Sequence, residues 1–280
     1  MKVTASETLI NQKSNFVLEV DLPLPLNAGC KIDVLIPKPL VIGPEMTRVT
    51  ISGLFGSIRD AEITLDAELN RIHVQNACLS YRANVVKAVF ELSALVNPGY
   101  VTTSESFFLE VSDANDNKIV KTSGGMVYTT SPGSVKVNSW FASNRLVSAL
   151  SDITFSVQPF NPSPAADVQI KLYLPREDFE EVPSPCKVVF TNQLVDASKI
   201  SCASDPSANA LILSHVLKDR YTFNELSPIE FGVSDVRMPS STRPTGTYTV
   251  EFLANIGGVY KLVDTATVTD MLRALPGGLL

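Results

Sequence analysis

A short acidic stretch, DANDN at residues 113–117, carries residue types that bind calcium. Asp113, Asn115 and Asp116 offer carboxylate and amide oxygens close together in the chain. Calcium takes roughly six to eight oxygen ligands, several of them from other segments. The sequence shows no companion acidic motif that would supply the remaining oxygens. The alternative is a tight turn, because Asn and Asp tolerate left-handed backbone and can hydrogen-bond their own main chain.

The two histidines, His73 and His215, lie at nearly corresponding places in strand-like runs, NRIHVQN and LILSHVL. No H-x-x-x-H or C-x-x-C pattern accompanies them, and no nucleophile elbow, P-loop or dinucleotide fingerprint occurs. A lone histidine lacks the partners that acid–base catalysis requires. We therefore expect structural or surface histidines, no bound cofactor and no enzymatic activity.

The four cysteines fall in two groups. Cys186 and Cys202 lie close in sequence, and a local disulfide between them would contribute about 3 kcal/mol in the loop-entropy model. A pair of free surface thiols is the alternative. Cys30 and Cys78 lie far apart in the chain, and two interpretations stay open for them. They are either small buried residues or a bridge between two strands across the core.

Composition excludes several classes of protein. The 280 residues suffice for one large or two ordinary domains, and a 45% hydrophobic against a 19% charged fraction indicates a packed core. The net charge is −6 and no basic run occurs, so the sequence gives no support to nucleic-acid binding. The longest apolar stretches are far shorter than the roughly 20 residues of a membrane helix, so we expect no membrane insertion.

An internal repeat organises the chain. KIDVLIPKPL (31–40) aligns with QIKLYLPRED (169–178), and NRIHVQNACLSY (70–81) aligns with NALILSHVLKDR (209–220). A third pair, FELSALVNPGY (90–100) and FGVSDVRMPSS (231–241), keeps the same order. We infer two copies of one domain, residues 1–131 and 134–270, followed by a tail or linker at 271–280. Pro132-Gly133 punctuates the junction.

Each copy is predicted to be rich in strands. Apolar and polar residues alternate through Cys30–Ile36 and again through Val168–Leu174, which is typical of half-buried strands, and a proline follows each. Many short strands between Pro, Gly, Ser and Asn residues predict an all-β fold of two tandem antiparallel β-sandwich, Ig-like domains. Short helices are considered only near DASKI (196–200) and MLRAL (271–275).

The repeat also places the acidic stretch. DANDN aligns with ANIGG at residues 254–258, a Gly-Gly turn between two strand-like runs. The segment resembles the D-x-N-D-N calcium motif of cadherins, but that motif lies at a domain junction, whereas this one lies inside a domain. We therefore expect a hairpin turn at 113–117, with a weak calcium site at Asp113, Asn115 and Asp116 as the minor alternative.

The motifs KIDVLIP, QIKLYLP and VSDVRMPSSTRPTGTYTVEF together resemble a unit of large, repetitive cell-surface proteins of ciliated protists. The paired cysteines of that family resemble Cys186 and Cys202. The first copy departs from the pattern, because it has Tyr100 and Val101 where a serine is expected and lacks the cysteine pair. The resemblance implies extracellular Ig-like modules with structural or adhesive roles and supplies no catalytic residues.

The sequence is compatible with three functions. The first is a structural module of an extracellular fibre or surface coat, joined end to end to like domains or to copies of itself. The second is a binding module that recognises a glycan or a protein through loops such as NPGYVTTSES (97–106). The third is a hydrolase with two carboxylates about 5–9 Å apart in a cleft, for which the sequence selects no pair. A start without an apolar leader segment and a linker-like end, ALPGGLL, suggest a piece of a longer extracellular protein.

Overall fold

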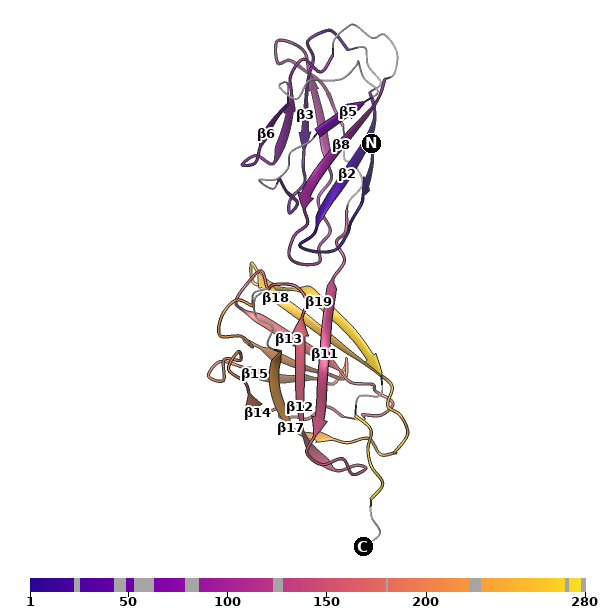
Figure 1. Cartoon of the computed structure of the whole chain (residues 1–280), viewed down its shortest axis with the longest axis vertical. Helices are drawn as coiled ribbons and strands as arrows, with labels where there is room; N and C mark the ends of the chain where they lie inside the picture. The colour runs from indigo at the N-terminus through magenta and orange to yellow at the C-terminus, as the bar shows by residue number, and fades with distance from the viewer. Residues whose placement is uncertain are drawn as a thin grey trace. The chain divides into compact units, whose positions relative to one another are not determined.

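The computed structural model describes residues 1–22, 26–42, 49–52, 63–78, 86–122, 128–179, 181–221, 228–269 and 272–277. These residues form strands, turns and loops and contain no helix, so the predicted all-β sandwich fold is confirmed. No helix long and apolar enough to cross a membrane occurs in the described residues. The chain divides into two compact units, Met1–Ser131 and Pro132–Leu280 (Figure 1).

The described residues of unit 1 form two sheets that are antiparallel throughout. The first has the order β1-β2-β8-β4, and β5 pairs with β8 as well. Its strands are β1 (Lys2–Ala5), β2 (Lys13–Leu22), β4 (Val41–Ile42), β5 (Val49–Ser52) and β8 (Val86–Val96). The second has the order β10-β9-β3-β7-β6. Its strands are β3 (Lys31–Leu35), β6 (Ile63–Asp66), β7 (Arg71–Val74), β9 (Phe108–Ser112) and β10 (Lys118–Lys121).

Unit 2 joins its strands in the order β14-β17-β12-β11-β19-β18-β13-β16-β15. The strands of its first half are β11 (Gly133–Ala142), β12 (Leu150–Pro159), β14 (Val188–Thr191) and β17 (Ile229–Arg237). Those of its second half are β13 (Val168–Tyr173), β15 (Ser201–Asp205), β16 (Ala210–Ser214), β18 (Thr247–Ile256) and β19 (Val259–Thr269). The two halves are continuous because β11 pairs in parallel with β19 at Gly133 and Ser134 and then antiparallel with β12.

The two units share one strand order. The run β1-β2-β8-β5 of unit 1 corresponds to β11-β12-β17-β14 of unit 2, and β10-β9-β3-β7-β6 corresponds to β19-β18-β13-β16-β15. Left-handed backbone recurs at matching places as well. The matched residues are Asn11 and Ser148, Asn70 and Asn209, Asn76 and His215, Ala94 and Asp235, and Asp116 and Gly257. The colinear sequence repeat thus corresponds to a repeat of topology and of turn geometry.

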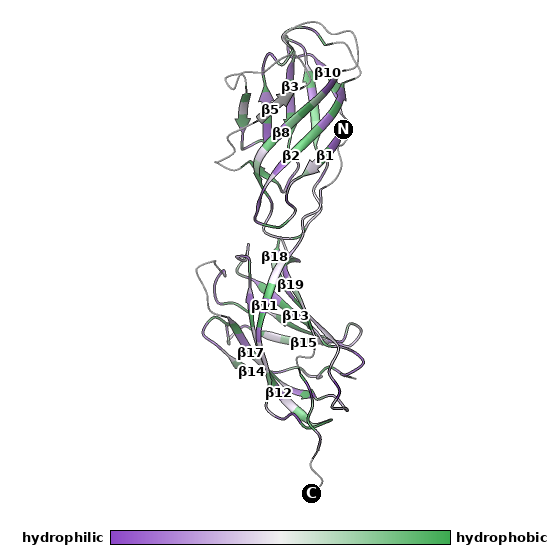
Figure 2. Cartoon of the chain, turned by 45° about the vertical axis from the view of Figure 1, so that its right-hand side comes forward, coloured by the Kyte–Doolittle hydropathy of each residue, from purple (hydrophilic) through white to green (hydrophobic). Residues whose placement is uncertain are grey.

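Alternation of apolar residues builds a core in each unit. Ile32 and Val34 of β3 are fully buried, as are Ile170 and Leu172 of β13. Figure 2 shows apolar residues recurring along β2 and β8. The core of unit 2 includes Trp140, which packs edge-on against Phe155 and Tyr248 at ring-centroid distances of 4.5 and 4.9 Å.

Neither predicted short helix forms in the described residues. Residues 196–200 make a single turn, in which the Ile200 N–H donates to the Asp196 carbonyl at 2.9 Å. Of the second segment, Met271 lies outside the described residues, and 272–275 is irregular and bridges Leu146 through Leu275. Segments this short cannot offset the cost of helix nucleation by themselves. Within the described part of the expected tail, Leu272 and Ala274 are buried and Leu275 pairs with Leu146, whereas Pro276 and Gly277 are exposed.

Candidate functional sites

The acidic stretch 113–117 connects β9 to β10 as a hairpin turn. The Asp113 carboxylate accepts hydrogen bonds from the Asn115 and Asn117 main-chain N–H groups, at 2.8 and 2.9 Å, and from the Asn117 side chain at 2.8 Å. The Asn117 side chain and backbone hold the pKa of Asp113 below its ordinary value. Asp116 adopts a left-handed backbone with a φ of 68°, the geometry that favours Asn, Asp or Gly in such turns.

The two carboxylates of this turn have partners within the protein. Asp113 is occupied by its own turn, and Asp116 forms an ion pair with Lys31 at 2.6 Å. The described residues contain no group of three or more His, Cys, Asp or Glu side chains that could hold a metal. The arrangement of Asp113, Asn115 and Asp116 thus favours a self-contained turn.

The structure joins the cysteines in two disulfides. Cys186 and Cys202 are bonded with a Cα–Cα distance of 5.4 Å, and Cys30 and Cys78 with one of 5.1 Å. Cys186 precedes β14, and Cys202 lies in β15, so this bond links the two edge strands of unit 2. Both bonds lie within the Cα–Cα range of ordinary disulfides.

The second bridge lies within one sheet and does not cross the core. The Ala77 N–H donates to the Cys30 carbonyl at 2.8 Å, which extends the pairing of β3 with β7. In unit 2 the Val216 N–H donates to the Val168 carbonyl at 3.1 Å in the same way. The disulfide of unit 1 therefore occupies the place of an apolar pair, Val168 and Leu217, both buried.

Each histidine contacts one aspartate. His73 in β7 places its Nδ1 atom 2.6 Å from Asp33 of β3, and the His215 Nδ1 atom lies 3.0 Å from Asp167. The two positions differ, because His215 follows β16 in a left-handed turn that corresponds to Asn76. Neither aspartate could be predicted from the sequence, because both pairs depend on segments that meet only in the folded chain.

One polar row crosses the outer face of the second sheet in unit 1. Asp33 lies directly opposite both Glu110 and His73, and Glu110 pairs with Lys121 at 2.9 Å and with Lys118 at 3.3 Å. The hydrogen bond from Lys121 lowers the pKa of Glu110, against the effect of burial. The carboxylates of Asp33 and Glu110 lie on neighbouring strands, and each has a basic side chain beside it. This arrangement is typical of a structural network of ion pairs.

A second polar cluster gathers around Asp167 at one end of unit 2. Asn255 donates to its carboxylate at 2.9 Å, and the Tyr260 hydroxyl donates at 3.0 Å. Burial by itself raises the pKa of Asp167, but these donors and His215 hold the net pKa below its ordinary value. Burial and the facing Asp167 carboxylate raise the pKa of Tyr260. The cluster fastens the loop before β13 to the β18–β19 hairpin.

The buried Asp264 is a site that the sequence analysis missed. It accepts hydrogen bonds from the Asn161 main-chain N–H at 2.8 Å and from the Asn161 side chain at 2.6 Å. Burial raises the pKa of Asp264, in opposition to these bonds. A Cβ atom added to Gly133 would lie 2.0 Å from the Asn161 amide nitrogen and 2.2 Å from an Asp264 oxygen, so glycine is required there. The two hydrogen bonds fasten the segment after β12 to β19, at the point where Gly133 of β11 pairs with Asp264.

The loop considered for ligand binding, residues 97–106, is fastened to its own unit. The Asn97 side chain donates to the Glu7 and Leu9 carbonyls, and Thr130 Oγ1 donates to the carbonyls of Tyr100 and Thr102. The largely exposed aromatic side chains of the described residues are Phe141, Phe160 and Phe190, all in unit 2. The loop therefore does not present an exposed aromatic face.

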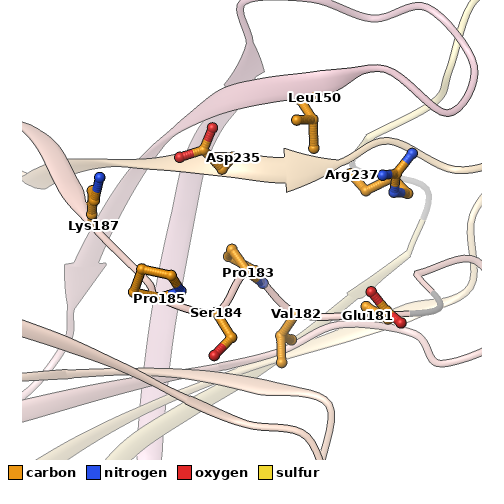
Figure 3. Close-up of a pocket in the computed structure, with 9 residues that line it drawn as sticks. All are labelled: Leu150, Glu181, Val182, Pro183, Ser184, Pro185, Lys187, Asp235 and Arg237. Carbon is orange, nitrogen blue, oxygen red and sulfur yellow. The ribbon is translucent and has the colours of Figure 1, made fainter.

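A pocket of about 340 Å³ opens on unit 2 between residues 181–187 and β17 (Figure 3). Charges of both signs line it: Lys187 lies at one end, Glu181 and Arg237 lie at the other, and Asp235 extends from β17. Asp235 accepts a hydrogen bond from Ser234 Oγ at 2.8 Å, and Arg237 donates to a carbonyl at 3.1 Å. Such a lining suits a dipolar group rather than an apolar ligand.

No known family model matches the chain, and no curated protein sequence matches it. Among solved structures, it is similar to the C-terminal domain of the Streptococcus agalactiae antigen I/II polypeptide BspA, at 10% identity, over 96% of this chain and 99% of that one, with a TM-score of 0.31. The C-terminal domain of the Streptococcus pyogenes antigen I/II-family protein AspA gives 10% identity, 94% of both chains and a TM-score of 0.33.

A type II cohesin dyad from the ScaA scaffoldin of Acetivibrio cellulolyticus gives 15% identity, 99% of this chain, 97% of that one and a TM-score of 0.25. Similarities of this size carry no conclusion about function. The resemblance to ciliate surface proteins stays a prediction.

Proposed function

We propose that the chain is a non-enzymatic module of an extracellular surface coat or fibre, in which two disulfide-bonded sandwiches serve as folded spacers. The observation that supports this most is that each unit has its own disulfide, Cys30–Cys78 or Cys186–Cys202. Disulfides persist in oxidising surroundings and are rare in the cytosol. An extracellular location is therefore part of the proposal.

The state of the polar side chains supports a structural role over catalysis. His73 faces Asp33, Glu110 faces two lysines, and Asp167 accepts three side-chain donors. A catalytic site needs groups directed at a space that a substrate can enter. These groups are directed at one another, which suits strand-to-strand and loop-to-strand fixation.

End-to-end association with like domains is the assembly that we propose. Its support is the shared strand order of the two units, since tandem copies of one design can be extended by further copies. A role in recognition is the second candidate. The charged pocket beside β17 favours it more than residues 97–106 do.

Surface exposure on the source cells tests the proposal. Antibodies raised against the folded chain should label intact cells, and permeabilisation should add little further signal. Protease treatment of intact cells should remove the epitope. Labelling that requires permeabilisation, with an epitope resistant to external protease, would contradict an extracellular coat or fibre.

A further inference from the structure

A groove of about 490 Å³ runs along the outer edge of β14. One wall consists of the six consecutive residues 186–191, and the facing wall is formed by Ala197, Ile200 and Cys202. Within the part of the chain that the structure describes, β14 pairs with β17 alone and ends its sheet. The groove therefore follows a strand that has one side open.

The backbone of β14 is oriented for a further partner. The Asn192 N–H donates to the Glu230 carbonyl at 3.0 Å, and Phe190 and Thr191 lie opposite Gly232 and Phe231. Antiparallel strands alternate between residues that bond the neighbour and residues whose N–H and C=O point away from it. Thr191 consequently turns both of its main-chain groups away from β17, towards the groove.

The side chains that line the groove combine apolar surface with one charged group, that of Lys187. Val189 is 52% exposed and Phe190 is 46% exposed, which is unusual for large apolar residues on an edge strand. Ile200 contributes from the facing wall, and Lys187 lies beside Cys186 at one end.

We propose that this groove binds one extended segment of a partner protein, which adds to β14 as a further strand. Neighbouring strands lie about 4.8 Å apart, so a single strand beside β14 brings its backbone to Thr191. The segment would carry apolar residues towards Val189 and Ile200 and a carboxylate towards Lys187.

The facing wall argues for a single strand rather than a second copy of the chain. If the β14 strands of two copies paired edge to edge, the Ala197 and Ile200 wall of each copy would lie against the other copy. A single strand brings no such second wall. The Cys186–Cys202 bond ties β14 to that wall, so the groove keeps its width without a ligand. Such preorganisation reduces the cost of ordering on binding. The inference holds whether or not the chain belongs to a surface coat.

The probe is a phage-displayed library of random octapeptides, selected against the whole 280-residue chain. Three variants are compared with it. Thr191→Pro removes an outward N–H without removing a bond to β17, and Ala197→Trp fills the groove from the exposed opposite wall. Ala208→Trp, at an exposed turn outside the groove, is the matched control.

We expect selected peptides with alternating apolar residues and an acidic residue, and protection of the Thr191 amide from hydrogen exchange. Their affinity should fall roughly tenfold or more in both groove variants and stay unchanged in Ala208→Trp. Thermal unfolding of each variant shows whether it is folded, and Ala197→Trp provides the test if Thr191→Pro is not.

Three results would overturn the proposal. One is selection that yields no peptide with higher affinity for the wild type than for Ala197→Trp. Another is binding that folded Thr191→Pro or Ala197→Trp retains in full. The third is self-association of the free chain that both variants abolish, which would assign the groove to a second copy.

Discussion

Asn70 and Asn209 occupy equivalent places in the two units and make the same contacts. Each has a left-handed backbone, with φ values of 52° and 51°. The Asn70 amide donates to the Ile36 and Leu40 carbonyls at 2.9 and 2.8 Å. The Asn209 amide donates to the Leu174 and Phe179 carbonyls at 3.1 and 3.0 Å. One buried asparagine thus fastens the loop that follows β3 in unit 1 and the loop that follows β13 in unit 2.

Replacement of Asn209 by Ala should destabilise unit 2 by about 3 kcal/mol, because two buried carbonyls lose their donor and alanine resists a positive φ. Asn209→Gly keeps the backbone geometry and should cost about 2 kcal/mol. Trp140 is the single tryptophan and lies in the core of unit 2, so its fluorescence reports this unfolding in denaturant. Equal stability of wild type and Asn209→Ala would refute the role assigned to this side chain.

The disulfides should contribute unequally. Cys186 and Cys202 are separated by 16 positions and Cys30 and Cys78 by 48. The loop-entropy model then gives about 3 kcal/mol for the first bond and about 4 kcal/mol for the second.

Two double variants at Cys30 and Cys78 separate the loop-closure entropy of the disulfide from the packing of the side chains at these positions. The change to Val and Leu, the residues of unit 2 at these places, should lose about 2 kcal/mol less than the change of both to Ser, which buries hydroxyl groups. Denaturant unfolding of unit 1 measures both. A serine pair as stable as the apolar pair would contradict the correspondence of these positions.

Several of these features could be predicted from the sequence and others could not. Period-two alternation identified β3 and β13, and the alignment of DANDN with a Gly-Gly turn indicated the hairpin at 113–117. The short separation between Cys186 and Cys202 in the sequence predicts their disulfide. Cys30 and Cys78 stayed undecided because only the pairing of β3 with β7 brings them together.

Contacts between residues of distant loops could not be predicted, because no local sequence pattern marks them. Asp167, His215 and Tyr260 come from three separate segments, and no spacing rule connects them. The buried asparagines, in contrast, are visible in the sequence, because the aligned runs NRIH and NALI both begin with Asn at the same place in the repeat. A polar residue shared by two otherwise apolar repeats can mark a left-handed position.

Asp264 should make unit 2 more stable as the solution becomes more acidic. Its folded pKa is raised above the ordinary value of 3.8, so the native state binds the proton more readily than the unfolded state. The free energy of unfolding therefore rises as pH falls through the folded pKa and levels off below the unfolded one.

Asp264→Asn removes this titrating group. As pH falls, the free energy of unfolding of the wild type should therefore increase relative to that of Asp264→Asn. Urea unfolding, followed by Trp140 fluorescence at several pH values between neutral and about 4, measures it. Asp152→Asn, at an exposed position, is the control. A wild-type advantage that is constant with pH would show that Asp264 does not titrate in this way.

The acidic turn should fold without a metal. Asp113→Ala removes three hydrogen bonds and should lower the melting temperature at neutral pH, while a chelator should leave the melting temperature of the wild type unchanged. Differential scanning calorimetry with and without calcium checks both. A melting temperature that calcium raises in the wild type but not in Asp116→Asn would establish a calcium site there.

The extracellular module that we propose closes each of its two units with a disulfide. The most direct measurement is mass spectrometry of the protein released from intact cells by external protease, with thiols alkylated before any reduction. We expect unalkylated, linked peptides that contain Cys30 with Cys78 and Cys186 with Cys202. Alkylated cysteines in a protein that is released only after cell lysis would contradict it.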